Sequence, residues 1–191
     1  QIISTPSVSA ASATVKVNTT VANDRSTAAA CALTYRILNK NNDVVGTQTA
    51  QQTIAARSTA VFSMTSTIAT PDLWSPSSPA LYRMVTTVSV DGVPVDDYLD
   101  RFGVRTIVWS KDSGFILNGK RLEICGVNLH QDFAWVQNAV PLSRHYKIIE
   151  FIKDAGFNTM RCSHYPRSPS FYDACDEQGL LLFTETPSWG W

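Results

Sequence analysis

The chain lacks an excess of charge of either sign, because its 16 Lys and Arg balance its 16 Asp and Glu. A neutral chain has no long-range attraction for nucleic acid or anionic lipid, so we expect neither as a partner. Long hydrophobic runs are also missing, since runs such as residues 180–183 fall far short of the roughly 20 residues that a membrane-spanning helix needs. These absences argue against a nucleic-acid-binding protein and against a helical membrane protein.

The chain lacks a cysteine motif of the kind that binds metals. The four cysteines are Cys31, Cys125, Cys162 and Cys175. They form no C-x-x-C pair and no ligand-like spacing with histidine, which argues against a structural zinc site. Their apolar or β-rich neighbours favour buried free thiols. A disulfide between Cys125 and Cys162 is the alternative, because these two residues could lie on adjacent strands.

Motifs of several enzyme classes are absent. No Gly-rich phosphate loop follows a predicted strand, which argues against a nucleotide-dependent enzyme. No G-x-S-x-G sequence supports a Ser-His-Asp triad. The first residues have neither the basic nor the apolar region of a signal peptide, and the chain does not begin with Met. We therefore interpret it as a segment of a longer protein.

The first half of the chain has the period of β-strands. Its overall composition, with 44% hydrophobic and 17% charged residues, is typical of a globular protein. Between residues 12 and 108 apolar and polar side chains alternate, as at Leu33, Tyr35 and Ile37. Asp91-Gly92 is a hairpin dipeptide. About seven such strands predict an antiparallel, immunoglobulin-like β-sandwich over residues 1–107, in which residues 1–11 are either a lead-in strand or a linker.

In residues 108–191 short apolar strands alternate with helices. Asn118-Gly119 predicts a type I′ turn in a hairpin. The expected strands that follow are residues 122–127, 157–161 and 180–184. The residues expected to bound the two intervening helices are Ser143 and Gly156 for the first, and Ser168, Pro169 and Gly179 for the second. This alternation predicts three parallel strands of an α/β fold.

Polar, charged and aromatic residues follow all three predicted strands. Because the carboxyl ends of parallel strands meet at one edge of a sheet, we expect these side chains to form a ligand site. The candidates are Asn128, His130, Gln131 and Asp132, then Arg161, Ser163, His164 and Tyr165-Pro166, then Glu185, Trp189 and Trp191. The two tryptophans fit either a platform for a sugar ring or plain packing. A metal site at His130, His164 and Glu185 is a weaker alternative, because these residues lack helical i, i+4 spacing.

Five segments within residues 73–185 form a recognisable set: Leu73-Trp74-Ser75-Pro76, Arg101-Phe102-Gly103-Val104-Arg105, Gly126-Val127-Asn128-Leu129-His130, Met160-Arg161-Cys162-Ser163-His164-Tyr165-Pro166 and Asp173-Ala174-Cys175-Asp176. Together they resemble family 2 glycoside hydrolases of the β-galactosidase kind, and the resemblance is clear over this range. It implies that residues 108–191 are the beginning of a TIM-barrel domain, truncated after three βα strands. Before residue 73 the assignment to this family depends on the sandwich pattern alone.

The resemblance also implies a chemistry, namely retaining hydrolysis of a terminal β-galactoside by two carboxylates. In this family both glutamates come from later barrel strands, so we expect the chain by itself to be inactive. Residue by residue, His130 and His164 match histidines that contact sugar hydroxyls, and Arg161 matches an arginine that orients the nucleophile. Glu185 matches a residue that supports the pocket. Asn128, Asp132 and Trp189 complete the expected sugar-binding set.

Some positions depart from the family pattern. Leu129 and Gln131 replace a common Arg and Glu. Trp189-Gly190-Trp191 occupies the stretch where magnesium ligands occur as Glu-x-His, so we expect no metal and no other cofactor. A β-glucuronidase-type hydrolase and a non-catalytic carbohydrate-binding module are the alternative functions. Uncovered barrel edges also predict self-association of the chain.

Overall fold

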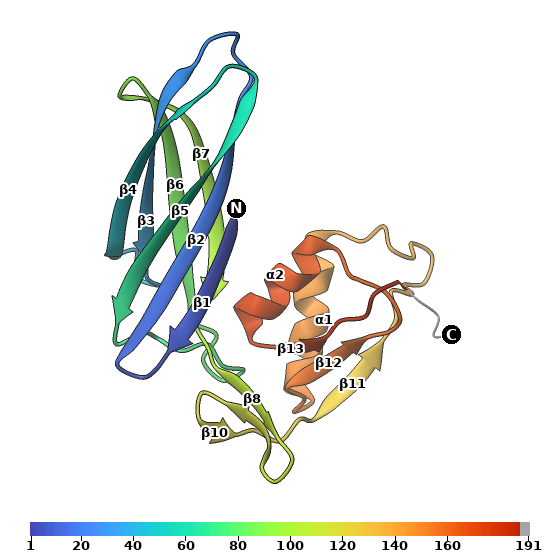
Figure 1. Ribbon diagram of the computed structural model, residues 1–191. Coiled ribbons are helices and arrows are strands. Elements are labelled where there is room, and N and C mark those ends of the chain that lie inside the picture. The colour runs from blue at the N-terminus through green and yellow to red at the C-terminus, as the bar shows by residue number, and fades with distance from the viewer. Residues whose placement is uncertain (188–191) are drawn as a thin grey trace. The chain divides into compact units, whose positions relative to one another are not determined.

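The computed structural model describes residues 1–187 and is shown in Figure 1. The chain divides into two compact units. The first consists of Gln1–Leu73 and Ala80–Thr106, and the second of Trp74–Pro79 and the residues from Ile107 onward. Trp189 and Trp191, two of the candidate residues, lie outside the described part of the chain. Neither described helix is long and apolar enough to cross a membrane.

Seven antiparallel strands build the first unit, which confirms the predicted immunoglobulin-like sandwich (Figure 1). One sheet has the order β1-β2-β5 and the other β4-β3-β6-β7. The strands are β1 (Ile2–Val8), β2 (Ser12–Asn23), β3 (Ala29–Leu38), β4 (Val44–Ile54), β5 (Ser58–Ala69), β6 (Leu81–Val90) and β7 (Val93–Gly103). The N-terminal residues are thus a strand and not a linker. Asp91 and Gly92 have φ angles of 52° and 79°, as the predicted hairpin turn requires.

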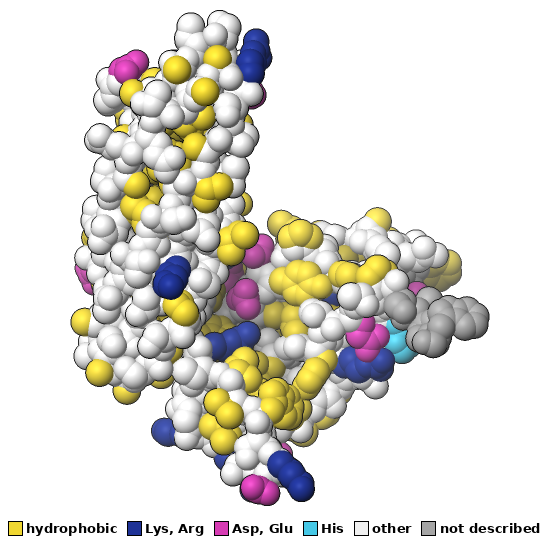
Figure 2. Space-filling view, viewed as in Figure 1, with side chains coloured by type: hydrophobic (Ala, Val, Ile, Leu, Met, Phe, Trp, Pro, Cys, Tyr) yellow, Lys and Arg dark blue, Asp and Glu magenta, His cyan; other side chains and the backbone are white. Residues whose placement is uncertain are grey.

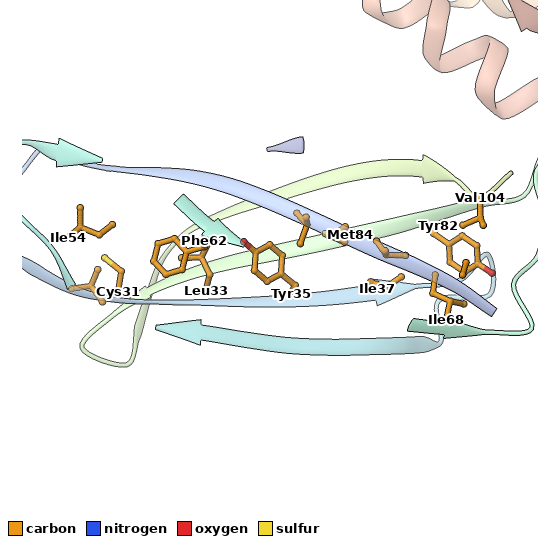
Figure 3. Packing of buried hydrophobic residues seen from close by; sticks show 14 of the residues in the cluster. Cys31, Leu33, Tyr35, Ile37, Ile54, Phe62, Ile68, Tyr82, Met84 and Val104 are labelled. Atoms are coloured by element: carbon orange, nitrogen blue, oxygen red, sulfur yellow. The ribbon is translucent and has the colours of Figure 1, made fainter. Parts of the chain in front are cut away.

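The core of the first unit lies between the two sheets. Alternate residues of β3 point inward, and Leu33, Tyr35 and Ile37 are buried. Figure 3 shows these three side chains among others of the same cluster, including Phe62 from β5 and Met84 from β6. Burial alternates along β2 and β3 with the period of two that the sequence predicted.

From Ile107 the second unit continues with a small antiparallel sheet of order β10-β9-β8. Its strands are β8 (Ile107–Ser110), β9 (Gly114–Leu117) and β10 (Lys120–Arg121). Asn118 and Gly119, between β9 and β10, have φ angles of 52° and 75°. Two successive positive φ values define the type I′ turn, so this prediction is confirmed.

A parallel sheet of order β11-β12-β13 follows, which confirms the truncated barrel segment (Figure 1). Its strands are β11 (Gly126–Leu129), β12 (Thr159–Cys162) and β13 (Leu181–Phe183), joined by the helices α1 (Leu142–Asp154) and α2 (Pro169–Gln178). Met160 and Cys162 are fully buried in a cluster with Ile149 of α1 and Phe171 of α2. One face of the sheet therefore packs on the helices.

Local details differ from the sequence expectation at three places. Pro141, and not Ser143, is the N-cap of α1, since the Arg144 N–H donates to the Pro141 carbonyl at 2.9 Å and the helix begins at Leu142. The first parallel strand starts at Gly126 because Leu122 still donates to Phe115 of the hairpin, at 3.0 Å. All four cysteines are free, but Cys125 is exposed, which contradicts its expected burial.

The other predicted helix ends are confirmed. Gly156 follows α1 with a φ of 88°, and Gly179 caps α2 with a φ of 77°. Pro169 is the first residue of α2, where its missing N–H leaves no hydrogen bond unmade. These helix ends set the lengths of the connections from α1 to β12 and from α2 to β13.

Candidate functional site

The register of the parallel sheet brings the predicted site residues to one face. Asn128, Arg161 and Phe183 are paired across β11, β12 and β13. Since side chains alternate along a strand, they lie on the face opposite to the buried Met160 and Cys162. His130 and Glu185 come two residues after Asn128 and Phe183, just beyond the strand ends. The carboxyl edge of the sheet therefore collects these side chains.

Three of the candidates form a connected cluster. The carboxylate of Glu185 forms an ion pair with Nη2 of Arg161. His164 Nδ1 lies 3.2 Å from Oε2 of Glu185 and 3.3 Å from Nη2 of Arg161. Nδ1 donates to the carboxylate when it carries the proton and accepts from the guanidinium when it does not. The cluster therefore accommodates either tautomer of His164.

The side chains of this cluster are accessible. Those of Arg161, His164 and Glu185 are 42%, 31% and 26% exposed, so a ligand can reach them while they hold one another in place. Figure 2 shows basic, acidic and histidine side chains together on this face of the second unit. Within the residues that the structure describes, no three His, Cys, Asp or Glu side chains are grouped to hold a metal ion.

His130 extends the cluster by a ring contact. Its imidazole centroid lies 5.2 Å from that of His164, with the ring planes at 72°, and 6.4 Å from the ring of Tyr165. His130 is exposed, so its polar atoms are available to a ligand. A guanidinium, two imidazoles and a carboxylate offer the mixed donors and acceptors that sugar hydroxyls need.

Two candidates lie at the same edge without joining the cluster. Asn128 is exposed and pairs in register with Arg161. Asp132 is exposed in the loop after β11. Ser163 lies closer, since Nη1 of Arg161 donates to its hydroxyl at 3.4 Å. The Ser163–His164 peptide bond is cis.

Sequence reasoning missed Arg167, and it placed Tyr165 at this edge without a role for its hydroxyl. Arg167 is only 6% exposed, and its Nη2 donates to the carbonyl of Leu129. The Tyr165 hydroxyl accepts a hydrogen bond from the Gln131 N–H at 3.0 Å. An arginine between a proline and a helix start is ordinarily solvated, so no local signal indicated that this one is buried.

Two family models together match nearly the whole chain. Residues 1–105 match the family described as Glycosyl hydrolases family 2. Residues 108–191 match Glycosyl hydrolases family 2, TIM barrel domain. A Beta-galactosidase of Thermoanaerobacter pseudethanolicus is 38% identical over 120 residues, 62% of this chain. A Putative beta-glucuronidase of Formosa agariphila is also 38% identical over 120 residues, 63% of this chain.

Solved structures agree over nearly all of the chain. A putative beta-galactosidase from Bacteroides fragilis superposes with a TM-score of 0.93 at 30% identity, covering 97% of this chain and 28% of that one. Bacteroides uniformis beta-glucuronidase gives a TM-score of 0.92 at 31% identity, with 97% and 22% covered. The matched stretch spans only 16% and 15% of the two curated relatives. The chain belongs to glycosyl hydrolase family 2 and contains its immunoglobulin-like domain and the first part of its TIM barrel.

Proposed function

We propose that this chain supplies part of the sugar-binding pocket of a retaining exo-β-glycosidase that hydrolyses terminal β-galactosides. The observation that carries the proposal is the cluster of Arg161, His164 and Glu185, with His130 against it, at the carboxyl edge of the parallel sheet. Active sites of TIM-barrel enzymes lie at this edge. Asn128, Asp132 and Trp189 complete the proposed sugar-binding set.

The charge of the cluster favours a neutral sugar. A uronic acid carries a carboxylate, which binds best to a cation that is not already neutralised. The guanidinium of Arg161 is paired with Glu185, so the cluster offers no uncompensated positive charge from these two residues. Galactose needs only hydrogen bonds to its hydroxyls. We therefore place a β-galactoside before a β-glucuronide, although relatives with both names match the chain equally well.

The chemistry of the reaction needs groups beyond this cluster. Retaining hydrolysis uses two carboxyl groups about 5–5.5 Å apart, one as nucleophile and one as acid/base. Glu185 is paired with Arg161 and His164, which supports a positioning role for its carboxylate. The family resemblance assigns both catalytic glutamates to later strands of the barrel. We propose that the 191-residue chain alone binds sugar weakly and does not hydrolyse it.

A paired titration tests this proposal. The purified chain is titrated with methyl β-galactoside and with methyl β-glucuronide, and binding is followed by saturation-transfer NMR. We expect millimolar binding of the galactoside, weaker binding of the glucuronide, and no turnover of a nitrophenyl galactoside. Preference for the glucuronide would favour the second enzyme class. Binding far tighter than millimolar would favour a dedicated carbohydrate-binding module.

A separate observation supports self-association of the chain. In the second unit the apolar side chains of Ile107, Val108, Trp109 and Phe183 are between 43% and 62% exposed. The rings of Trp109 and Phe183 lie 6.4 Å apart, so they form one patch. Among the described strands β11 and β13 pair on one side only. We propose that copies of this chain associate through the patch and these strand edges.

A further inference from the structure

We propose that Arg167 is a positioning residue of the sugar site, which acts together with Tyr165 to hold His130 against His164. The positioning itself follows from contacts between residues of the chain. Its consequence for sugar binding rests on the function proposed above.

The first step concerns the residues on either side of the two histidines. His130 lies between Leu129 and Gln131, and His164 lies between Ser163 and Tyr165. The Ser163 N–H donates to the Leu129 carbonyl at 3.3 Å. The Gln131 N–H donates to the Tyr165 hydroxyl at 3.0 Å. The residues that precede the histidines are thus bonded to each other, and so are the residues that follow them.

The second step is that Arg167 contacts both of these links. Its Nη2 donates to the Leu129 carbonyl, the same oxygen that accepts from Ser163. Its guanidinium carbon also lies 5.6 Å from the ring centroid of Tyr165. One side chain therefore fixes the end of β11 and the ring whose hydroxyl holds Gln131. The ring-to-ring distance of 5.2 Å between His130 and His164 depends on both links.

The third step is that Arg167 is itself anchored. Its guanidinium carbon lies 5.6 Å from the ring centroid of Phe171, a residue of α2 that is only 2% exposed. Its backbone N–H donates to the Tyr172 hydroxyl at 2.9 Å. Arg167 therefore connects α2, which is packed in the core, to the ends of β11 and β12.

Arg167 is buried, unlike a solvated surface arginine, which indicates that its contacts are specific. Within residues 1–187, no carboxylate forms a salt bridge with it, and its Nε has no hydrogen-bond partner. Burying a charge without an opposite charge is costly. The contacts of Arg167 to the Leu129 carbonyl and to the two aromatic rings offset part of this cost, and two of these partners, Leu129 and Tyr165, lie beside the histidines.

Lys153 offers a matched control. It is also a cation bonded to carbonyl oxygens of the second unit, those of Pro76 at 2.7 Å, Gly179 at 3.3 Å and Gln178. Gly179 lies before β13, so this contact is at the opposite end of the sheet from the histidines. Replacing Lys153 removes comparable hydrogen bonds to carbonyl oxygens and leaves the strand ends that carry the site unchanged.

The test uses the His130–His164 ring contact as its readout. The chain has only 3 histidines, whose imidazole NMR signals are assigned by single His→Gln variants. We expect a nuclear Overhauser effect between the His130 and His164 rings in the unmodified chain and in Lys153→Met. We expect it to be lost or strongly reduced in Arg167→Met and in Tyr165→Phe. Arg167→Lys, which keeps a donor but not the planar group, should restore it in part.

The outcomes separate the inference from the proposed function. An unchanged ring contact in folded Arg167→Met and Tyr165→Phe overturns the positioning role, and so does an equal loss in Lys153→Met. If Arg167→Met does not fold, Tyr165→Phe decides, because it removes a single hydroxyl. In the galactoside titration we expect about fivefold weaker binding for Tyr165→Phe, the effect of one lost hydrogen bond. A chain that shows the ring contact and its losses but binds no galactoside refutes the proposed function alone.

Discussion

The carboxylate of Glu185 forms an ion pair with the guanidinium of Arg161 across the carboxyl ends of β13 and β12. Arg161 pairs in register with Phe183, so the strand alternation places Glu185 on the same face, just beyond the strand end. The pair thus results from the sheet register, and it gives the site an acceptor and a donor in fixed positions.

Replacing Glu185 with Gln should weaken galactoside binding without unfolding the chain. The substitution keeps the shape but removes the negative charge that holds Arg161 and His164. Because Arg161 and Glu185 are 42% and 26% exposed, solvent screens their attraction, and we expect the free energy of unfolding to change by less than about 1 kcal/mol. Thermal unfolding and NMR titration measure the two effects. Glu150→Gln, on the exposed face of α1, is the control and should change neither by a comparable amount.

The stability of the second unit should decrease at acidic pH because of His145. Burial, and then the nearby charge of Arg167, lower the pKa of His145 from 6.5. The unfolded chain therefore binds a proton at pH values where the folded chain does not. The free energy of unfolding should fall as the pH drops below 6.5 toward the lower pKa of the folded state.

Denaturant titrations at several pH values check this dependence. In His145→Asn the amide can still reach Ser170, whose hydroxyl lies 3.1 Å from Nδ1 of His145, but the titrating group is gone. The decrease in stability should then be smaller. His130→Asn, at an exposed position, should keep the decrease of the unmodified chain. An identical pH dependence in His145→Asn would refute the assignment.

Two glycines with positive φ should respond differently to substitution by alanine. A Cβ on Gly179 would lie 2.6 Å from the Pro76 carbonyl oxygen, whereas a Cβ on Gly156 would meet nothing within 4 Å. Both variants carry the cost of a left-handed backbone, roughly 1–2 kcal/mol, and Gly179→Ala adds a backbone clash. We therefore expect Gly179→Ala to be the less stable variant in urea unfolding. Equal losses would show that Trp74–Pro79 does not pack there as described.

The exposed apolar patch should make the chain associate with itself. Trp109 is 62% exposed and lies 4.9 Å from the ring of Phe115. Light scattering should show a mass that rises with concentration, and Trp109→Ser should reduce this rise. Trp135→Ser is the matched control, because Trp135 is fully exposed in the loop after β11 and not part of the patch. A strictly monomeric unmodified chain would contradict the proposal.

The sequence predicted those parts of the structure whose cause is local. Asn118-Gly119 and Asp91-Gly92 form the expected turns because few other residues adopt two successive positive φ angles. Gly179 ends α2 because glycine readily adopts the left-handed conformation of a helix C-cap. The collection of Arg161, His164 and Glu185 at one edge was predictable because parallel strands share a direction.

Features caused by distant parts of the chain were not predictable. Trp74–Pro79 belongs to the second unit because Trp74 Nε1 donates to the Asp176 carbonyl at 2.8 Å, a contact between residues far apart in sequence. Arg167 is buried because Tyr165 and Phe171 pack against it, and the apolar periodicity of the sequence does not predict such a contact. Cys125 is exposed since it precedes β11, where the chain has left the hairpin but has not yet entered the sheet.

The most direct test of the sugar site is to map where methyl β-galactoside perturbs the backbone NMR signals of the chain. The account predicts the largest shifts at His130, Arg161, His164 and Glu185, with loss of these shifts in Glu185→Gln. Shifts confined to the strands of the first unit, or shifts that Glu185→Gln leaves unchanged, would contradict it.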